Sequence, residues 1–395
     1  MMTLGIDVAK RSHTATLLDE GGAPVFQGVT FEHSREGVDA FLALLGQHAP
    51  PGGALVGMEA TGHCWKVLFQ HVFRAGYEAK LLNPILTSAK RSAEIRGGKD
   101  DGPDSRRIAE VLRKEGLQAS AVPEGDAKVL REMGRLRFRL SKAATAEKQR
   151  LGALLDAAFP EWGEHFSDPF GAASLAALLE FPTAAHAAKA DVRRLANVLN
   201  RASRGRMGRE KAKELKAAAR KSFSLEGEQE ALAEDIRFTV ERIRQCADQI
   251  ARVDKRCRSL FPGEQAVLRT ASGIGPAWAA TILGEVLPFF DPALRDGGKK
   301  FVAAAGIDVR PYSSGQMKTP GRMSKRGSKY LRTAAMQAAA AAVNFARDPA
   351  LVAMYERQKA RGKHHLVALS HVARKLLHIV FALLKTGRPY SPATT

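Results

Sequence analysis

The sequence predicts an α/β domain at the amino terminus, a helical middle region and a mostly α-helical domain at the carboxyl terminus. Strand-length apolar runs alternate with helical patterns at the start of the chain, two long charged helices follow, and Ala-rich helical patterns fill the last third. We place the domains at 1–122, 123–262 and 263–395, with an inserted helical segment at 160–221. A chain of 395 residues is long enough for this division.

Three antiparallel strands are expected to open the chain. The first, within residues 1–10, is an apolar run that contains a single carboxylate, Asp7. A β-rich run at 13–19 follows, and a pair of glycines separates it from a third strand at 24–31. A buried carboxylate costs free energy unless a cation meets it, so Asp7 is the first candidate metal ligand.

Strands then alternate with helices. Helical patterns at 36–47 and 65–74 frame a buried strand at 54–59, which ends on Glu59, and a short strand at 77–82 comes next. The second carboxylate therefore stands at the carboxyl end of a strand.

A third acidic segment begins an amphipathic helix after a glycine-rich stretch. Asp101 and Asp104 are three residues apart, so they share one face if the helix has begun there. Oxygen ligands of this kind suit Mg²⁺ or Mn²⁺, and two such ions about 4 Å apart could assist an in-line displacement at phosphorus. The alternative is that each acid caps a helix or lies in solvent, and it stays open most of all for Asp101 and Asp104.

Four short motifs contain or separate these acids: Gly5-Ile6-Asp7, Glu59-Ala60-Thr61-Gly62, Asn83-Pro84 and Lys99-Asp100-Asp101-Gly102-Pro103-Asp104-Ser105. In these motifs and their order the chain resembles the DEDD-type insertion-sequence transposases, the insertion sequence one-ten family, which includes the Piv-type DNA invertases. The resemblance implies a RuvC-like, ribonuclease-H-type amino-terminal domain whose metal ligands are Asp7, Glu59, Asp101 and Asp104. Two residues depart from the family pattern, Asp100 for Thr and Ser105 for Ala, and Asp100 is a competing ligand.

A Gly-x-Gly turn lies between two helical patterns at the start of the last third. Its glycines, Gly273 and Gly275, give a helix-hairpin-helix signature, in which backbone N–H groups at a helix start can hold a DNA phosphate. The alternative is an ordinary helical hairpin, because glycine and proline punctuate any such turn.

A serine pair follows at Ser313-Ser314, ahead of Gly315 and a loop that leads to a long Ala-rich helix. The resemblance makes Ser314 the nucleophile, with Ser313 as the alternative, although Pro311 lies one or two residues later than the family's proline. It implies a phosphoserine link to DNA, with the serine activated by metal-bound carboxylates of another protomer. Without the resemblance, a solvated Ser-Gly loop would be the better interpretation. Six basic residues of this segment are candidates for binding phosphate: Arg310, Arg322, Lys325, Arg326, Lys329 and Arg332.

The middle region contains two long charged helices, at 127–159 and 225–260. The second has an apolar heptad repeat, which predicts a coiled-coil seam and a homo-oligomer, either a dimer or a tetramer. A hairpin with the first helix in the same chain would use the same stripe and is the alternative. The heptad positions are Leu225, Leu232, Ile236, Thr239, Ile243, Cys246, Ile250, Val253, Cys257 and Leu260.

Composition agrees with a nucleic-acid enzyme. Sixty-one Lys and Arg against 41 Asp and Glu give a net charge of +20 and a pI of about 10.1, so polyanions are the expected partners. Charge alone would equally suit a ribosomal or chromatin protein. Three scattered cysteines favour a reducing cytoplasm, and the Ala-rich stretch near Ala338 is shorter than the ~20 residues that span a bilayer, so no membrane is expected.

The sequence thus predicts a DNA transposase or site-specific recombinase, located in the prokaryotic cytoplasm at the nucleoid and acting on donor and target DNA with Mg²⁺ or Mn²⁺. The resemblance adds a non-coding bridge RNA that pairs with both DNAs. Two alternatives are a RuvC-like metal-dependent nuclease that acts on branched DNA by water attack, and a non-catalytic nucleic-acid-binding assembly protein.

Overall fold

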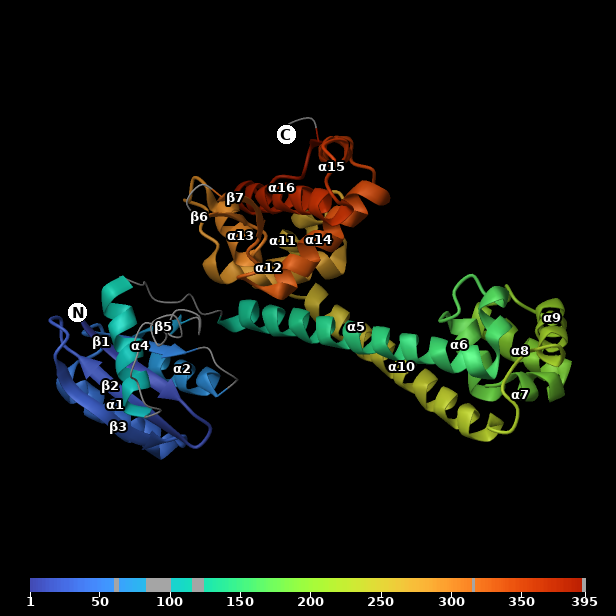
Figure 1. The fold of residues 1–395 in the computed structure, drawn as a ribbon, viewed down its shortest axis with the longest axis horizontal. Helices are drawn as coiled ribbons and strands as arrows, with labels where there is room; N and C mark the ends of the chain where they lie inside the picture. The colour runs from blue at the N-terminus through green and yellow to red at the C-terminus, as the bar shows by residue number, and fades with distance from the viewer. Residues whose placement is uncertain (60–63, 83–100, 116–123, 315–316, 393–395) are drawn as a thin grey trace. The chain divides into compact units, whose positions relative to one another are not determined.

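The computed structural model describes the chain except for residues 60–63, 83–100, 116–123, 315–316 and 393–395, and it leaves out the side chains of 101–103, 115 and 309–322 (Figure 1). The described chain divides into two compact units, Met1–Val122 and Pro123–Thr395. Each unit has hydrophobic cores of its own.

Unit 1 is built on a mixed five-stranded sheet with the order β3-β2-β1-β4-β5. The first three strands are antiparallel, as predicted, while β4 runs parallel to β1 and β5 runs parallel to β4. The strands are β1 (Met2–Val8), β2 (Ser12–Leu18), β3 (Pro24–Glu32), β4 (Ala54–Glu59) and β5 (Glu78–Leu82).

Helices cover both faces of this sheet. On one face, α1 (Arg35–His48) and α2 (Trp65–Arg74) bury apolar side chains against the alternate residues of the strands, and Phe31 of β3 stacks on Phe41 of α1 with ring centroids 4.0 Å apart. On the other face, α4 (Asp101–Glu115) packs Ile108 and Leu112 against the sheet.

Helix α4 lies unusually close to the sheet because two glycines face it. Gly5 of β1 and Gly57 of β4 are partners in the parallel register. A Cβ atom on Gly5 would lie 2.5 Å from the amide nitrogen of Ala109, and one on Gly57 would lie 2.9 Å from the Cγ atom of Leu112. Any larger residue would therefore push the helix away from the strands.

In unit 2, α5 (Gly125–Ala158) and α10 (Gln229–Arg258) form a long antiparallel hairpin (Figure 1). Its helices are joined by three ion pairs: Arg137 with Asp254 at 2.6 Å, Arg242 with Glu147 at 2.9 Å and Arg150 with Asp235 at 2.9 Å. Within the chain, α10 packs against α5, as in the hairpin alternative, and a coiled-coil contact between protomers stays a prediction.

The heptad repeat starts later than predicted. The helix begins at Gln229, and Leu225 lies in the preceding loop with 53% of its surface exposed. Gly227 adopts a φ of +94°, which lies outside the α-helical region, so the helix cannot extend back through this residue to Leu225. Later heptad positions, including Ile236, Ile243 and Val253, are buried.

We call residues 160–221 the head. It comprises short helices around the buried Trp162, whose Nε1 donates a 2.8 Å hydrogen bond to Ser174 Oγ, and it packs where α5 ends and α10 begins. The head consists mostly of helices, and its role as an insertion stays a prediction. Its elements are η1 (Pro160–His165), α6 (Ala172–Glu180), α7 (Ala184–Lys189), α8 (Val192–Ser203) and α9 (Arg209–Arg220).

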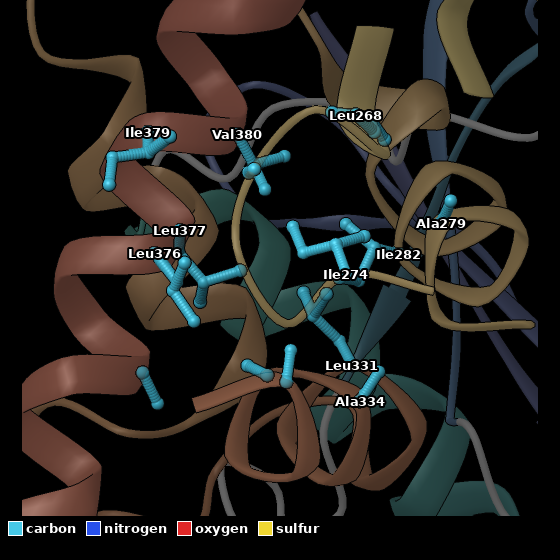
Figure 2. Close-up of a cluster of buried hydrophobic side chains, with 14 of the residues drawn as sticks. Leu268, Ile274, Ala279, Ile282, Leu331, Ala334, Leu376, Leu377, Ile379 and Val380 are labelled. Carbon is cyan, nitrogen blue, oxygen red and sulfur yellow. The ribbon is translucent and has the colours of Figure 1, made fainter. Parts of the chain in front are cut away.

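The carboxy-terminal part is mostly helical and surrounds the apolar α16. Figure 2 shows Leu376 and Val380 of this helix close to Ile274, Ile282 and Leu331. Although α16 is long and apolar enough to cross a membrane, most of it is buried in this core, as expected for the central helix of a folded domain. The elements are α11 (Pro262–Leu268), α12 (Pro276–Val286), η2 (Leu287–Phe289), α13 (Gly297–Ala305), β6 (Val309–Ser314), β7 (Met317–Met323), α14 (Lys329–Asn344), α15 (Pro349–Ala360) and α16 (His365–Thr386).

A buried carboxylate forms ion pairs between the carboxy-terminal part and α5. Glu285 of α12 is 3% exposed and accepts hydrogen bonds from Arg135 at 2.6 and 3.1 Å, while Arg131 lies 3.6 Å away. The Arg135 guanidinium also lies over the ring of Tyr330 in α14, 4.9 Å from its centroid. A buried charge needs such partners, so this contact fixes the register of α5 against α12.

Replacing Gly5 by Ala should destabilise unit 1. The added Cβ meets backbone atoms of α4, which cannot rotate away, so we expect a loss of about 3 kcal/mol or more in the free energy of unfolding. The matched control is Gly46→Ala in α1, whose Cβ would meet only the Tyr77 hydroxyl at 3.8 Å and which should be neutral or stabilising. Denaturant unfolding measures both, and equal effects would contradict the close contact.

Unit 1 should also lose stability as the pH falls from about 6.5 towards 4. Burial, with a smaller contribution from nearby His33, lowers the pKa of His13 from 6.5 to about 4. The unfolded chain therefore takes up a proton before the folded chain does, at a cost of up to about 3 kcal/mol. Thermal unfolding of wild type and His13→Leu across this window should show the wild type with the steeper decline. Parallel declines would contradict the assignment.

Candidate active site

Asp7 and Glu59 lie at the carboxyl ends of adjacent parallel strands. Ile6 of β1 is paired with Met58 of β4, so the next residue on each strand carries the carboxylate. Because successive side chains alternate between faces, Asp7 and Glu59 lie on the same face as Gly5 and Gly57, which is the face covered by α4. Both are half-buried.

Helix α4 brings a third carboxylate to this face. Its contact with Gly5 runs through Ser105 and Ala109, so the adjacent Asp104 lies at the same end of the sheet as Asp7. The Asp104 carboxylate is ion-paired with the buried guanidinium of Arg107. Asp101 is the first residue of α4, with its side chain outside the description, and the competing Asp100 lies outside the described residues.

The acids supply only oxygen donors, which fits a hard divalent cation. Within the described side chains no three His, Cys, Asp or Glu residues come close enough to hold a metal ion. The structure therefore places Asp7, Glu59 and Asp104 on one face without assembling them into a ligand cage.

Ser105, one of the departures from the family pattern, has a structural partner. It is fully buried, and its hydroxyl lies 2.8 Å from that of Thr16 on β2. Thr16 also accepts a 3.3 Å hydrogen bond from the Gly28 amide. The serine is thus accommodated by a hydroxyl on the neighbouring strand, and it leaves Asp104 in place.

Ser314 is the last residue of β6, in a two-stranded antiparallel hairpin that the sequence had indicated only as a loop. Ser314 is paired with Met317 and Ser313 with Lys318, so both serines lie at the turn end. Arg310 and Arg322 are partners nearer the base of the hairpin.

The base of this hairpin is held by several contacts that the sequence analysis missed. Ser324 donates its hydroxyl proton to Asp308, and its amide donates to the Asp308 carbonyl at 2.9 Å. Arg332 donates to the carbonyl oxygens of Ala305 at 2.8 Å and Lys325 at 3.4 Å. A predicted hairpin over this segment would have placed Asp308 opposite Ser324 and revealed the pair.

The six basic candidates therefore differ in their surroundings. Arg332 uses its guanidinium at the hairpin base, whereas Lys325, Arg326 and Lys329 are exposed. Lys329 also lies 5.3 Å from the ring centroid of Tyr330. The side chains of Arg310 and Arg322 lie outside the description, and among the other four candidates these three turn their charge to solvent.

The Gly-x-Gly turn joins α11 to α12, an arrangement common to a helix-hairpin-helix and an ordinary helical hairpin. Gly273 has a φ of +84°, and a Cβ there would lie 2.6 Å from the Ala342 amide nitrogen, so glycine is needed for packing on α14. Gly275 precedes α12 as its N-cap, and a Cβ there would meet nothing within 4 Å. Of the two glycines, Gly275 is the one with open space for a ligand.

Two family models match the chain. One, for DEDD-type IS110 transposases and described as "Transposase", matches residues 4–160, and the other, described as "Transposase IS116/IS110/IS902 family", matches residues 265–356. The chain belongs to the IS110 family of transposases. The first match includes Asp7, Glu59, Asp101 and Asp104 of this IS110-family transposase, and the second includes Ser314.

Relatives of this transposase carry related names. A "probable family 20 transposase" of Pseudomonas aeruginosa is 26% identical over 353 residues, 87% of each chain. A pilin gene-inverting protein of Moraxella bovis is 28% identical over 175 residues, 41% of this chain and 52% of its own. A 43.6 kDa protein of insertion element IS110 in Streptomyces coelicolor is 32% identical over 124 residues, 31% of this chain and 29% of its own.

Family membership defines the coarse biochemistry of the IS110-family transposase. It is a DNA-binding enzyme of transposition and recombination, and DEDD-type transposases commonly use a divalent metal ion. The DEDD match also agrees with a RuvC-like fold for unit 1, whose mixed sheet has parallel strands carrying Asp7 and Glu59.

The hydrogen bond between Ser105 and Thr16 should give a measurable coupling free energy between substitutions at the two positions. Ser105→Ala, which restores the family residue, and Thr16→Val should each cost stability, and a double-mutant cycle should give a coupling of about 1 kcal/mol. Denaturant unfolding of the four proteins measures it. A coupling near zero would show that the two hydroxyls do not hydrogen-bond.

Proposed function

We propose that this transposase cuts and rejoins DNA through Ser314, assisted by divalent metal held by Asp7, Glu59, Asp101 and Asp104. The observation that carries the proposal is the strand register that sets Asp7 beside Glu59 on the face covered by α4. Carboxylates at the ends of parallel strands beside a helix start are well placed to collect a cation and a phosphate.

Mg²⁺ or Mn²⁺ held there would neutralise charge on the phosphate and lower the pKa of a coordinated hydroxyl. The Ser314 Oγ atom then forms a bond to DNA phosphorus and loses its proton. The bond from phosphorus to a deoxyribose oxygen breaks, and that oxygen gains a proton. Rejoining reverses these changes with the hydroxyl of another strand, so the phosphoserine conserves the energy of the broken bond.

The exposed cations of the hairpin region support this chemistry. Lys325, Arg326 and Lys329 lie just after the base of the β6–β7 hairpin, whose turn end carries Ser314, and there they can neutralise DNA phosphates farther along the backbone from the reacting one. Gly275, at the open start of α12, can approach the same backbone without reading sequence. Ser313 is the alternative nucleophile.

Assembly and guidance are further parts of the proposal. The carboxylates of one protomer would serve Ser314 of another in a dimer or tetramer, and a bridge RNA would select donor and target DNA by base pairing. The net charge of +20 is compatible with more than one polyanion. The name of the pilin gene-inverting relative is consistent with site-specific recombination.

The decisive experiment is to assay recombination and trap a protein–DNA adduct with Ser314→Ala, using Ser313→Ala as the matched control. Loss of the nucleophile should abolish the adduct and lower recombination by at least about 10³-fold, while the control keeps both. Normal recombination by Ser314→Ala would refute Ser314 as the nucleophile.

The same assays separate the two alternatives. Retained cleavage of branched DNA by Ser314→Ala, without an adduct from wild type, would identify a nuclease that uses water. Asp7→Asn and Glu59→Gln should remove both cleavage and the adduct. If they leave activity unchanged, the carboxylates have no catalytic role, and a non-catalytic assembly protein becomes the better explanation.

A further inference from the structure

The head carries a concentration of positive charge that the proposed active site does not use. Between residues 189 and 221 there are twelve Lys and Arg against three Asp and Glu, which gives +9 of the chain's net +20 within 33 residues. All but the first residue of the head lie outside the two segments that the family models match, 4–160 and 265–356. Family membership therefore assigns no role to this charge.

The three acids of this segment are already engaged. Asp191 caps α8 by accepting a 2.9 Å hydrogen bond from the Arg194 amide. Glu210 pairs with Lys213, and Glu214 pairs with Lys211, each at 2.9 Å. They cannot balance the remaining arginines.

Most of the arginines have no acid beside them. Arg194 pairs with Glu180 at 2.8 Å, but none of the described carboxylates lies within ion-pair distance of the others on α8, α9 and the turn between them. The unmatched side chains are Arg193, Arg201, Arg204, Arg206, Arg209 and Arg220.

The exposed side chains of α8 form one basic ridge. Arg193, Asn197 and Arg201 follow one another at intervals of four residues, Arg204 is the C-cap of the helix, and all four are exposed. The opposite side of the helix is buried in the head core. Arg209, the first residue of α9, is also exposed.

The turn between the helices leaves room for a large ligand. Residues 204–208 join α8 to α9, with Arg204 and Gly205 in the left-handed region at φ 57° and 86°. Cβ atoms built on Gly205 and Gly208 would meet nothing within 4 Å. Arg204, Arg206 and Arg209 thus surround an open stretch of backbone that a phosphate chain can approach.

Positive charge is denser in this segment than on the α5–α10 hairpin, although that hairpin also carries exposed basic residues without an acid partner. On the α5–α10 hairpin of the same chain, Arg137, Arg150 and Arg242 each face a carboxylate across the helices. The head does not use its arginines for packing, because its core is apolar. Uncompensated like charges repel one another, and a bound polyanion removes that repulsion.

We propose that α8, the 204–208 turn and the start of α9 bind the backbone of duplex DNA without reading its sequence. From Arg193 to Arg204 the ridge is about 17 Å long, which matches about five base-pair steps along one strand. DNA is the favoured partner because the chain belongs to a transposase family. The proposal is independent of the serine mechanism, since binding requires no strand cleavage.

The test uses the full-length protein and a 30-base-pair duplex of random sequence, with binding measured by fluorescence anisotropy over a range of NaCl concentrations. The head variant changes Arg193, Arg201, Arg204 and Arg209 to Gln. Binding at about 0.1 M salt should weaken at least tenfold, and the slope of log K against log salt should fall by about 3.

The matched control removes the same charge from exposed residues of the α5–α10 hairpin, by changing Lys142, Arg244, Lys255 and Arg258 to Gln. It should weaken binding less than threefold. An equal loss of DNA binding in the control would overturn the proposal, because net charge alone would then explain binding. Unchanged DNA binding by a head variant that keeps the native circular dichroism spectrum would overturn it as well.

A duplex RNA of the same sequence distinguishes the two nucleic acids. If the head variant loses RNA binding but keeps DNA binding, the surface is an RNA site and the proposal is wrong. Adduct formation by the head variant on a short suicide substrate should persist, which separates this surface from the active site. If Ser314→Ala loses the adduct but binds DNA fully, that result supports the serine mechanism and leaves the proposal for the head untouched.

Discussion

The close contact between α4 and the sheet is the constraint on which the candidate site depends. Gly5 and Gly57 are register partners on neighbouring strands, and the absence of two side chains lets the helix backbone reach the strands. That approach sets Asp104 at the end of the sheet where Asp7 and Glu59 stand. The metal-binding function proposed for these acids therefore depends on two residues with no functional group.

In unit 2 the corresponding constraint is electrostatic. Glu285 is buried at the contact between α12 and α5, where Arg131 and Arg135 surround it. Such a group costs much free energy if one partner is lost, so it favours a single arrangement of the two helices. Tyr330 extends the contact to α14, the helix that follows the hairpin of Ser314.

Much of the fold could be predicted because periodicity is local. Apolar runs and helical spacing predicted the five strands and the long helices, but α10 starts at Gln229, after Gly227, and so later than the predicted first heptad position at Leu225. The β6–β7 hairpin was missed because Pro311 and Pro320 resemble loop residues. The strand register shifts between Arg310 and Tyr312, and such a bulge tolerates a residue without an amide proton. The contacts of Gly5 and Ser105 arise from strand order, which no local pattern reveals.

The way in which the head joins the α5–α10 hairpin has an evolutionary consequence. The amide of Leu225 donates a 2.9 Å hydrogen bond to the carbonyl of Ala157, and Glu161 accepts hydrogen bonds from the Ser222 hydroxyl and the Phe223 amide. Entry and exit of the segment are thus adjacent, as at the sites where whole domains are inserted into proteins. A lineage could gain, lose or exchange this segment while α5 and α10 remain paired. DNA binding by the head could then change in evolution while the residues proposed to cut and rejoin DNA stay the same.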